Sequence, residues 1–293
     1  MGGDLHCHTR LSDGSVGLED IITLAHNCKI ETIAITDHDC LAGTIRAKLI
    51  GERNGVEVIP GVELSAIDTE TGKDAHILCY LPEFPDRLEG LCRKNSTARK
   101  RAAQFMMIKA AGRYPVSTEL IRKCAAGSTC LFKQHIMHAL MESGISGGIY
   151  SEIHDELFSP DSENNILVRP QFASVDEVLT EIHAANGIAV LAHPALYDNF
   201  DLLERKVEEF DGVEVWHPTA DEETVDRLLK FAKKHKLLTT GGSDFHGMYG
   251  RQAMTLGKYV TPAAQLKDLK CYLSRKKRRE KKEAEEAKSS AAE

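Results

Sequence analysis

Short apolar runs alternate along this chain with stretches whose apolar residues recur at helical spacing. Seven of the runs have the length and composition of β-strands: Gly3 to Cys7, Glu31 to Ile35, Val56 to Pro60, Ala75 to Leu81, Ile188 to Leu191, Gly212 to Val215 and Leu237 to Thr240. Intervening segments such as Leu18 to Ala25 and Thr224 to Ala232 predict helices. The alternation predicts an α/β fold with parallel strands and crossover helices, arranged as a distorted TIM-like barrel of seven strand–helix units.

The alternation stops for about 100 residues between the fourth and fifth predicted strands. Residues 98–108 and 135–141 read as helices there, with polar loops around 144–148 and 159–165. We therefore expect residues 83–172 to form an inserted helical cap over the barrel mouth, and residues 1–82 and 173–273 to form the barrel. The methionines of the cap helices are expected in its core.

Composition agrees with a globular protein. The chain has 293 residues, 42% of them apolar, which is enough for a large core. It contains no run of about 18 apolar residues, and its start leads directly into a predicted strand rather than a signal peptide. We expect a soluble, cytoplasmic protein without a membrane partner. Its eight cysteines include no CxxC pair and are expected to be reduced, and Cys7 should face away from the two histidines that flank it.

Charge divides the chain into an acidic body and a mixed tail. The net charge is −7, although residues 274–293 hold more Lys and Arg than Asp and Glu. This tail is expected to be disordered, or a solvated and frayed helix. Contact with RNA is the alternative, but no aromatic residue is interleaved for base stacking.

Imidazole and carboxylate side chains stand at the ends of the predicted strands. The residues of this kind that we expect to bind metal are His6, His8, Asp13, His38, Glu63, His76, His193, Asp244 and His246. Barrel enzymes build their sites at the C-terminal ends of the strands, so one mouth would collect all nine. His217 also ends a strand, and it could contact substrate, support a ligand or simply pack.

The chemistry that these residues favour is metal-assisted hydrolysis. His6 and His8 are two apart on a strand and can hold one cation. Mixed nitrogen and oxygen ligands suit Mn, Fe or Zn, and two to three clustered ions can activate water and clamp a phosphoryl group. The sequence has no nucleophile elbow, Walker loop or dinucleotide-binding fingerprint. Asp37 and Asp39 are expected to cap the following helix or to support the ligands, not to bind metal.

The ordered set of ligand-type residues resembles the PHP (polymerase and histidinol phosphatase) family over about residues 3–250, and the cap resembles the branch that acts on nucleotides and RNA 5′ ends. The resemblance implies a PHP-type barrel and a three-metal pattern. One ion would be held by His6, His8, Glu63 and Asp244, a second by Glu63, His76 and His193, and a third by Asp13, His38 and His246. Glu63, Asp13 and His246 would act in catalysis through a metal-bound hydroxide.

The resemblance further implies a phosphoesterase of small nucleotides, for example one that converts a nucleoside 3′,5′-bisphosphate into the 5′-monophosphate and phosphate by attack of a metal-bridging hydroxide. The alternatives are a 5′-3′ exoribonuclease on short 5′-phosphorylated RNA, a histidinol phosphate phosphatase, and a non-catalytic metal-binding module. Lys133 and His135 stand where this branch has Arg-x-His. With Arg169 and His217 they are the expected substrate contacts, although Lys133 and Arg169 could equally be ordinary surface charges.

Overall fold

The computed structural model describes residues 2–251 and 254–290, with side chains in the last helix described as far as Arg278 and at Lys281. The strands are β1 (Gly3–Cys7), β2 (Thr32–Ile35), β3 (Glu57–Ile67), β4 (Asp74–Tyr80), β5 (Ala173–Ser174), β6 (Ile188–Leu191), β7 (Gly212–Trp216) and β8 (Leu238–Gly241). The α-helices are α1 (Leu18–Asn27), α2 (Thr44–Asn54), α3 (Glu89–Arg113), α4 (Thr118–Cys124), α5 (Lys133–Glu142), α6 (Glu152–Phe158), α7 (Val175–Ala184), α8 (Phe200–Arg205), α9 (Glu222–His235) and α10 (Ala263–Ser290). The short 3-10 helices are η1 (Pro85–Leu88) and η2 (Gly247–Tyr249).

The sheet is a nearly closed barrel with the strand order β1-β2-β3-β4-β6-β7-β8, and β5 pairs with the end of β3. The α/β barrel is confirmed, but the expectation of parallel strands throughout is wrong for β4. That strand runs antiparallel to both β3 and β6. A tight turn causes this, because Asp68 accepts a hydrogen bond from the Gly72 amide at 2.7 Å and leaves no room for a crossover helix between β3 and β4.

A register shift in β1 affects which face of the strand each side chain near His6 and His8 occupies. Asp4 pairs with Ile33 and Cys7 with Ile35, so β1 carries one extra residue over this interval. Leu5 consequently packs inside the barrel, whereas Cys7 packs outside it with the helix residue Ile21. Cys7 thus turns away from the barrel interior, as its flanking histidines led us to expect.

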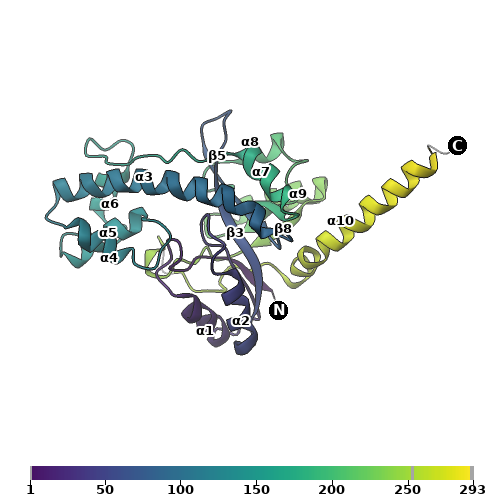
Figure 1. Ribbon diagram of the computed structural model, residues 1–293, viewed down its shortest axis with the longest axis horizontal. Helices are drawn as coiled ribbons and strands as arrows, with labels where there is room; N and C mark the ends of the chain where they lie inside the picture. The colour runs from purple at the N-terminus through teal and green to yellow at the C-terminus, as the bar shows by residue number, and fades with distance from the viewer. Residues whose placement is uncertain (1, 252–253, 291–293) are drawn as a thin grey trace.

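Helices cover the outside of the barrel, and α10 starts beside the barrel and then projects away from it (Figure 1). Ile21 and Ile22 of α1 pack over β1 and β2, and α7 packs over β4 and β6. Leu266 and Leu269 at the start of α10 join the apolar side chains of the barrel interior. The polar mouth therefore lies opposite α10.

The segment between β4 and β5 contains the helices α3 to α6, and α3 belongs to two cores. Leu91 and Cys92 at its start pack in the barrel core, whereas Met106 and Ala110 near its end pack in the core of the cap. Figure 1 shows α3 extending from the barrel across the whole cap. The cap is thus joined to the barrel by a continuous helix.

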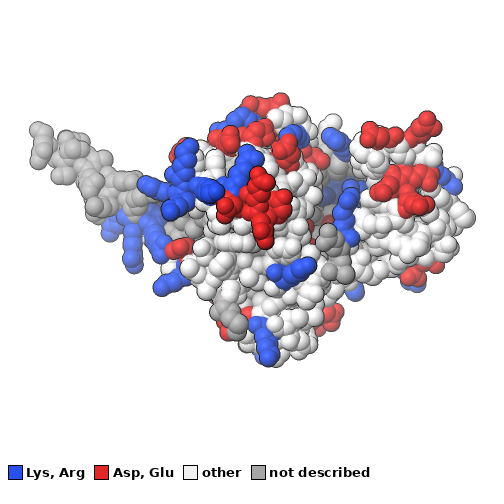
Figure 2. Space-filling model, turned by 180° about the vertical axis from the view of Figure 1, so that it is seen from behind, with Lys and Arg blue, Asp and Glu red and all other residues white. Residues whose placement is uncertain are grey.

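The charged tail continues the helix α10 through Ser290, and residues 291–293 lie outside the described part of the chain. Its Lys, Glu and Ala residues are strong helix formers, which the charge count alone does not register. Figure 2 shows Lys and Arg side chains gathered where α10 leaves the barrel. Within the described residues, no helix has both the length and the apolar character needed to span a membrane.

Candidate metal centre

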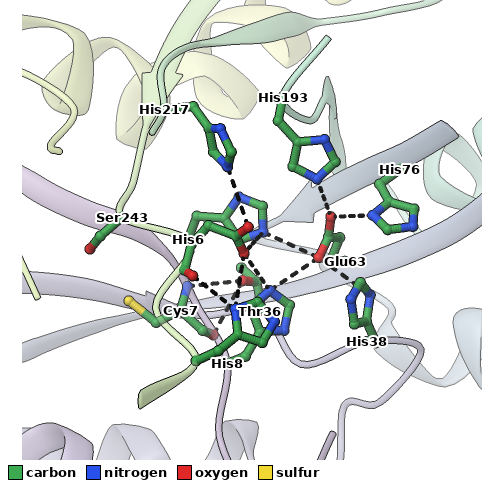
Figure 3. Close-up of polar contacts among 12 residues, drawn as sticks. His6, Cys7, His8, Thr36, His38, Glu63, His76, His193, His217 and Ser243 are labelled. Carbon is green, nitrogen blue, oxygen red and sulfur yellow. Dashed lines mark hydrogen bonds and ion pairs between the residues drawn. The ribbon is translucent and has the colours of Figure 1, made fainter. Parts of the chain in front are cut away.

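Glu63 is the centre of the site. The residue is only 1% exposed, and five imidazoles from four different segments surround its carboxylate. Oε1 lies 2.8 Å from His76 Nδ1 and 2.9 Å from His193 Nε2. Oε2 lies 3.2 Å from His6 Nε2, 3.1 Å from His8 Nε2 and 3.3 Å from His38 Nδ1. Figure 3 shows these rings pointing toward Glu63 from several sides.

Two of these residues reach the mouth by a route that the pattern did not predict. Each was expected at the C-terminal end of its strand, and that expectation is wrong for Glu63 and His76. Glu63 lies in the middle of β3, which is longer than the predicted strand. His76 lies near the start of β4, and because β4 is antiparallel its beginning is at the mouth.

A second group of ligand-type atoms surrounds Asp13. Its Oδ1 lies 3.3 Å from His246 Nε2, and its Oδ2 lies 3.8 Å from His38 Nε2. His8 belongs to both groups, because it also approaches Asp13 Oδ1 at 3.7 Å. Asp244 Oδ1 lies 3.3 Å from His8 Nε2. The Glu63 and Asp13 groups are therefore parts of one connected site.

Hydrogen bonds on the far sides of two rings determine where their lone pairs point. His6 Nδ1 lies 2.9 Å from Glu214 Oε1, and His246 Nδ1 lies 2.8 Å from the carbonyl oxygen of Asp244. Both partners accept hydrogen bonds, so each Nδ1 carries the proton. In the neutral ring Nε2 then presents a lone pair to a carboxylate oxygen, and such atoms repel unless a cation lies between them.

Several buried atoms of the site have no hydrogen-bond partner, and they mark the place for that cation. Those that face a carboxylate or an imidazole of the two groups are His6 Nε2, His8 Nε2, Asp13 Oδ1 and His38 Nδ1. Buried polar atoms in proteins are nearly always paired. Neutral imidazole nitrogens and carboxylate oxygens are the ligands of Mn, Fe and Zn. The residues present therefore fit divalent metal ions.

The electrostatics of these ligand-type residues also favours positive charge. Burial acts to raise the pKa of Glu63, but His38 and His6 hold it well below its ordinary value. Burial likewise opposes ionisation of Asp13, yet His246 and His38 keep its pKa well below the usual range. Burial disfavours charge on His8, but the neighbouring carboxylates of Asp244 and Glu63 raise its pKa to about 10. The carboxylates thus stay ionised and demand a counter-charge.

A family model of the PHP domain matches residues 4–188, which include six of the nine residues around this site. The chain belongs to the PHP domain family. Residues 189–293 lie outside the matched range, but they supply His193, Asp244 and His246 to the same mouth.

Relatives of this PHP chain carry several names. A phosphoribosyl 1,2-cyclic phosphate 1,2-diphosphodiesterase from Eggerthella lenta is 36% identical over 85% of this chain and 95% of its own length. A 3′,5′-nucleoside bisphosphate phosphatase from Chromobacterium violaceum is 29% identical over 83% of this chain and 86% of its own. The 5′-3′ exoribonuclease Rnm from Escherichia coli is 28% identical over 83% of this chain and 84% of its own.

A solved structure from Bifidobacterium adolescentis, named as a metal-dependent phosphoesterase, has a TM-score of 0.84 and 26% identity to this PHP chain. The match covers 92% of this chain and 96% of that one, so it includes the cap as well as the barrel.

Buried carboxylates outside the predicted ligand set hold the histidines of the PHP site in place. Glu214, which the sequence analysis missed, accepts from His6 Nδ1 and from the His193 backbone amide, each at 2.9 Å. The feature of the sequence that could have identified it is a single acidic residue inside an apolar strand. Asp37 accepts from Ser12 Oγ at 2.6 Å, and Ser12 Oγ lies 3.5 Å from His8 Nδ1.

Two further aspartates brace the surrounding segments. Asp39 accepts from Asn95 Nδ2 and Arg99, each at 2.8 Å, so it ties α3 to the barrel. Asp4, also missed, accepts from the Ser243 amide at 2.9 Å and thereby fixes the residue before Asp244. Neither Asp37 nor Asp39 belongs to a group of converging ligand atoms among the residues described.

His217 is positioned as a hydrogen-bond donor to a neighbouring carboxylate. Its Nδ1 accepts from the Thr219 amide at 3.1 Å, so the proton of the neutral ring is on Nε2. That nitrogen lies 3.4 Å from Asp244 Oδ2. His217 therefore supports a residue of the site from the side, instead of presenting a lone pair to it.

The three predicted cap contacts lie in different places. Lys133 is half-buried, and burial and then Arg251 lower its pKa, while Asp74 and Asp13 act in the opposite direction. His135 Nδ1 accepts from the Phe132 amide at 3.1 Å at the start of α5, and burial lowers its pKa to about 4. Arg169 is exposed and lines an open groove of about 580 Å³ beside α3. Lys133 thus interacts electrostatically with Asp13 of the site, whereas Arg169 lies on a separate surface.

Proposed function

We propose that this protein is a metal-dependent phosphoesterase of small phosphorylated ribose compounds. The observation that carries the proposal is the set of buried lone pairs and carboxylate oxygens that converge without partners around Glu63 and Asp13. When bound there, clustered divalent ions would supply Lewis acidity for the phosphoryl group and an activated water. The family and the named relatives support the same reaction class.

For the ligands we propose the three groups that the family pattern implies. His6, His8, Glu63 and Asp244 would hold one ion, Glu63, His76 and His193 a second, and Asp13, His38 and His246 a third. The contacts of Glu63 support its bridging position, because its two oxygens face different sets of imidazoles. We propose two to three ions of Mn, Fe or Zn, since imidazole ligands disfavour Mg and Ca.

For the substrate we propose a ribose with two phosphate groups, of which one is hydrolysed at the metals and the other is bound by the cap. A nucleoside 3′,5′-bisphosphate meets this description. Lys133 is the residue of the cap best placed for the second phosphate, because no ion pair holds it among the residues described and Arg251 shares its surroundings. His217 would act on substrate only through Asp244. His135 and Arg169 are weaker proposals, because His135 caps α5 and Arg169 faces the groove.

A five-membered cyclic phosphate on phosphoribose is the second candidate substrate. It is favoured by the 36% identity to the Eggerthella lenta enzyme, whose name specifies that class of compound. It too carries one phosphate ester for the metals and one phosphate for the cap. The two candidates differ in what hydrolysis releases. Cleavage of the bisphosphate releases inorganic phosphate, whereas opening of the cyclic diester leaves its phosphate attached to the ribose.

A substrate panel tests these proposals. Protein stripped with a chelator and reloaded with Mn is expected to release phosphate from adenosine 3′,5′-bisphosphate or to open a ribose cyclic phosphate, and the stripped protein is expected to do neither. A ladder of mononucleotides from a labelled 5′-phosphorylated oligoribonucleotide would instead identify an exoribonuclease, and phosphate release from histidinol phosphate alone would identify that phosphatase. Inactivity of the metal-loaded protein on the whole panel would refute the phosphoesterase.

A further inference from the structure

Tyr197 lies in the loop that follows β6 and that also supplies His193. This loop is fixed to the start of β4 at two points. Asn199 Nδ2 donates to the carbonyl oxygen of Asp74 at 3.0 Å, and Lys73 Nζ lies 3.0 Å from Asp198 Oδ2. The position of Tyr197 is therefore set by the same contacts that hold the mouth of the barrel together.

The ring of Tyr197 packs against two imidazoles of the site. Its centroid lies 5.2 Å from that of His76 and 5.6 Å from that of His193, both in edge-to-face geometry. These two imidazoles share Glu63 Oε1. Tyr197 is thus the aromatic wall beside the proposed second metal position.

The phenol hydroxyl has no hydrogen-bond partner among the residues that the structure describes. The ring that carries it lies against His76 of β4 and His193 after β6, at the mouth of the barrel. A phenol of ordinary pKa is neutral near pH 7. A neutral O–H that is held there and has no protein acceptor is available to a ligand.

We propose that the Tyr197 hydroxyl donates a hydrogen bond to a non-bridging oxygen of the substrate phosphoryl group, an inference that rests on the proposed phosphoesterase function. The residues around Glu63 offer carboxylates and imidazole lone pairs, which cannot donate to phosphate. Phosphate oxygens accept hydrogen bonds, and they gain from donors fixed in place before the reaction. Tyr197 supplies such a donor without adding a charge next to the ligands.

Replacement of Tyr197 by Phe tests this role, because it removes the hydroxyl and retains the ring that packs on His76 and His193. Tyr114→Phe is the matched control, since its phenol bonds Glu156 inside the cap at 2.9 Å. Metal content, inhibition by inorganic phosphate and kcat/KM are measured on the metal-loaded proteins. Loss of one hydrogen bond to a charged group is expected to weaken phosphate inhibition and kcat/KM about tenfold or more in Y197F, with metal content unchanged and Y114F like wild type.

Equal phosphate inhibition in Y197F and wild type would overturn the proposal. Loss of metal from Y197F would overturn it as well, because the residue would then act through the ligands. Calorimetric titration of inorganic phosphate into the metal-loaded proteins keeps this test separate from the proposed function. If wild type hydrolyses nothing on the panel but binds phosphate more tightly than Y197F does, the phosphoesterase fails and the hydrogen bond stands.

Discussion

Replacing Glu214 by Gln is expected to weaken metal binding while leaving the fold intact. Glu214 is 1% exposed, and its two oxygens accept from His6 Nδ1 and from the His193 amide. Gln has nearly the same shape but offers one accepting oxygen and one donating NH₂ group. In either orientation of the amide, its NH₂ group faces another donor, which is either the His6 Nδ1–H group or the His193 amide. The unfavourable contact at His6 can be removed only if the ring proton moves from Nδ1 to Nε2, the atom that faces Glu63.

The magnitude follows from the two contacts. A buried hydrogen bond that involves a charged group contributes about 1.5–3 kcal/mol, and loss of a carboxylate that orients a metal-binding His typically lowers metal affinity roughly 10–100-fold. Because tenfold corresponds to about 1.4 kcal/mol, the two figures agree. Glu214 also positions His193 through its backbone, so the upper part of this range is expected.

The assay is competition for metal against a chromophoric chelator, with circular dichroism as the check on folding. Glu204→Gln is the matched control, because Glu204 is exposed and its nearest cation, Arg227, lies 3.8 Å away. E204Q is expected to bind metal like wild type. A metal dissociation constant for E214Q within about twofold of wild type would refute the role given to Glu214.

The remaining predictions concern other parts of the chain. Asp13→Ala and His246→Ala should each abolish turnover in the phosphate-release assay while thermal unfolding stays cooperative, and retained turnover would remove them from the site. Lys133→Ala should raise KM for a bisphosphate about tenfold or more, with Lys133→Arg close to wild type, and an unchanged KM would place Lys133 outside the substrate site. Burial acts to raise the pKa of Asp68, but hydrogen bonds, including one from Arg205, lower it. Its stabilisation is therefore present above pH 4 and lost as pH falls through the lowered pKa. Asp68→Asn should thus destabilise by about 1–2 kcal/mol at pH 7 in denaturant melts, with the difference disappearing near pH 2; a pH-independent difference would contradict this assignment.

The barrel was predictable because its strands are short apolar runs with clear ends. The direction of β4 was not, since an apolar run has the same pattern in either direction. Antiparallel pairing depends on the turn at Asp68, which closes β3 onto β4 within a few residues. The bulge in β1 was equally invisible, because it depends on the register against β2 and not on a residue type.

The residues that face the site were predictable as a group, because their spacing along the chain follows the strands. Their supports were harder to predict. Glu214 was hidden within an apolar strand, and the importance of Asp4 depends on Ser243, almost the whole chain away. Arg169 could not be placed from the sequence, because its charge is compatible with substrate contact or with an ordinary surface position, and the structure places it in the groove beside α3.

The single helix that joins cap and barrel has a mechanical consequence. At 25 residues α3 is a rod of roughly 38 Å, and it lacks proline along its whole length. Its first turns are anchored by Leu91 and Cys92 and its last by Met106 and Ala110, so the cap cannot swing open on a loop hinge at this junction. We therefore expect the distance between cap and barrel to stay nearly constant at this junction. Cap and barrel are accordingly expected to unfold in one transition.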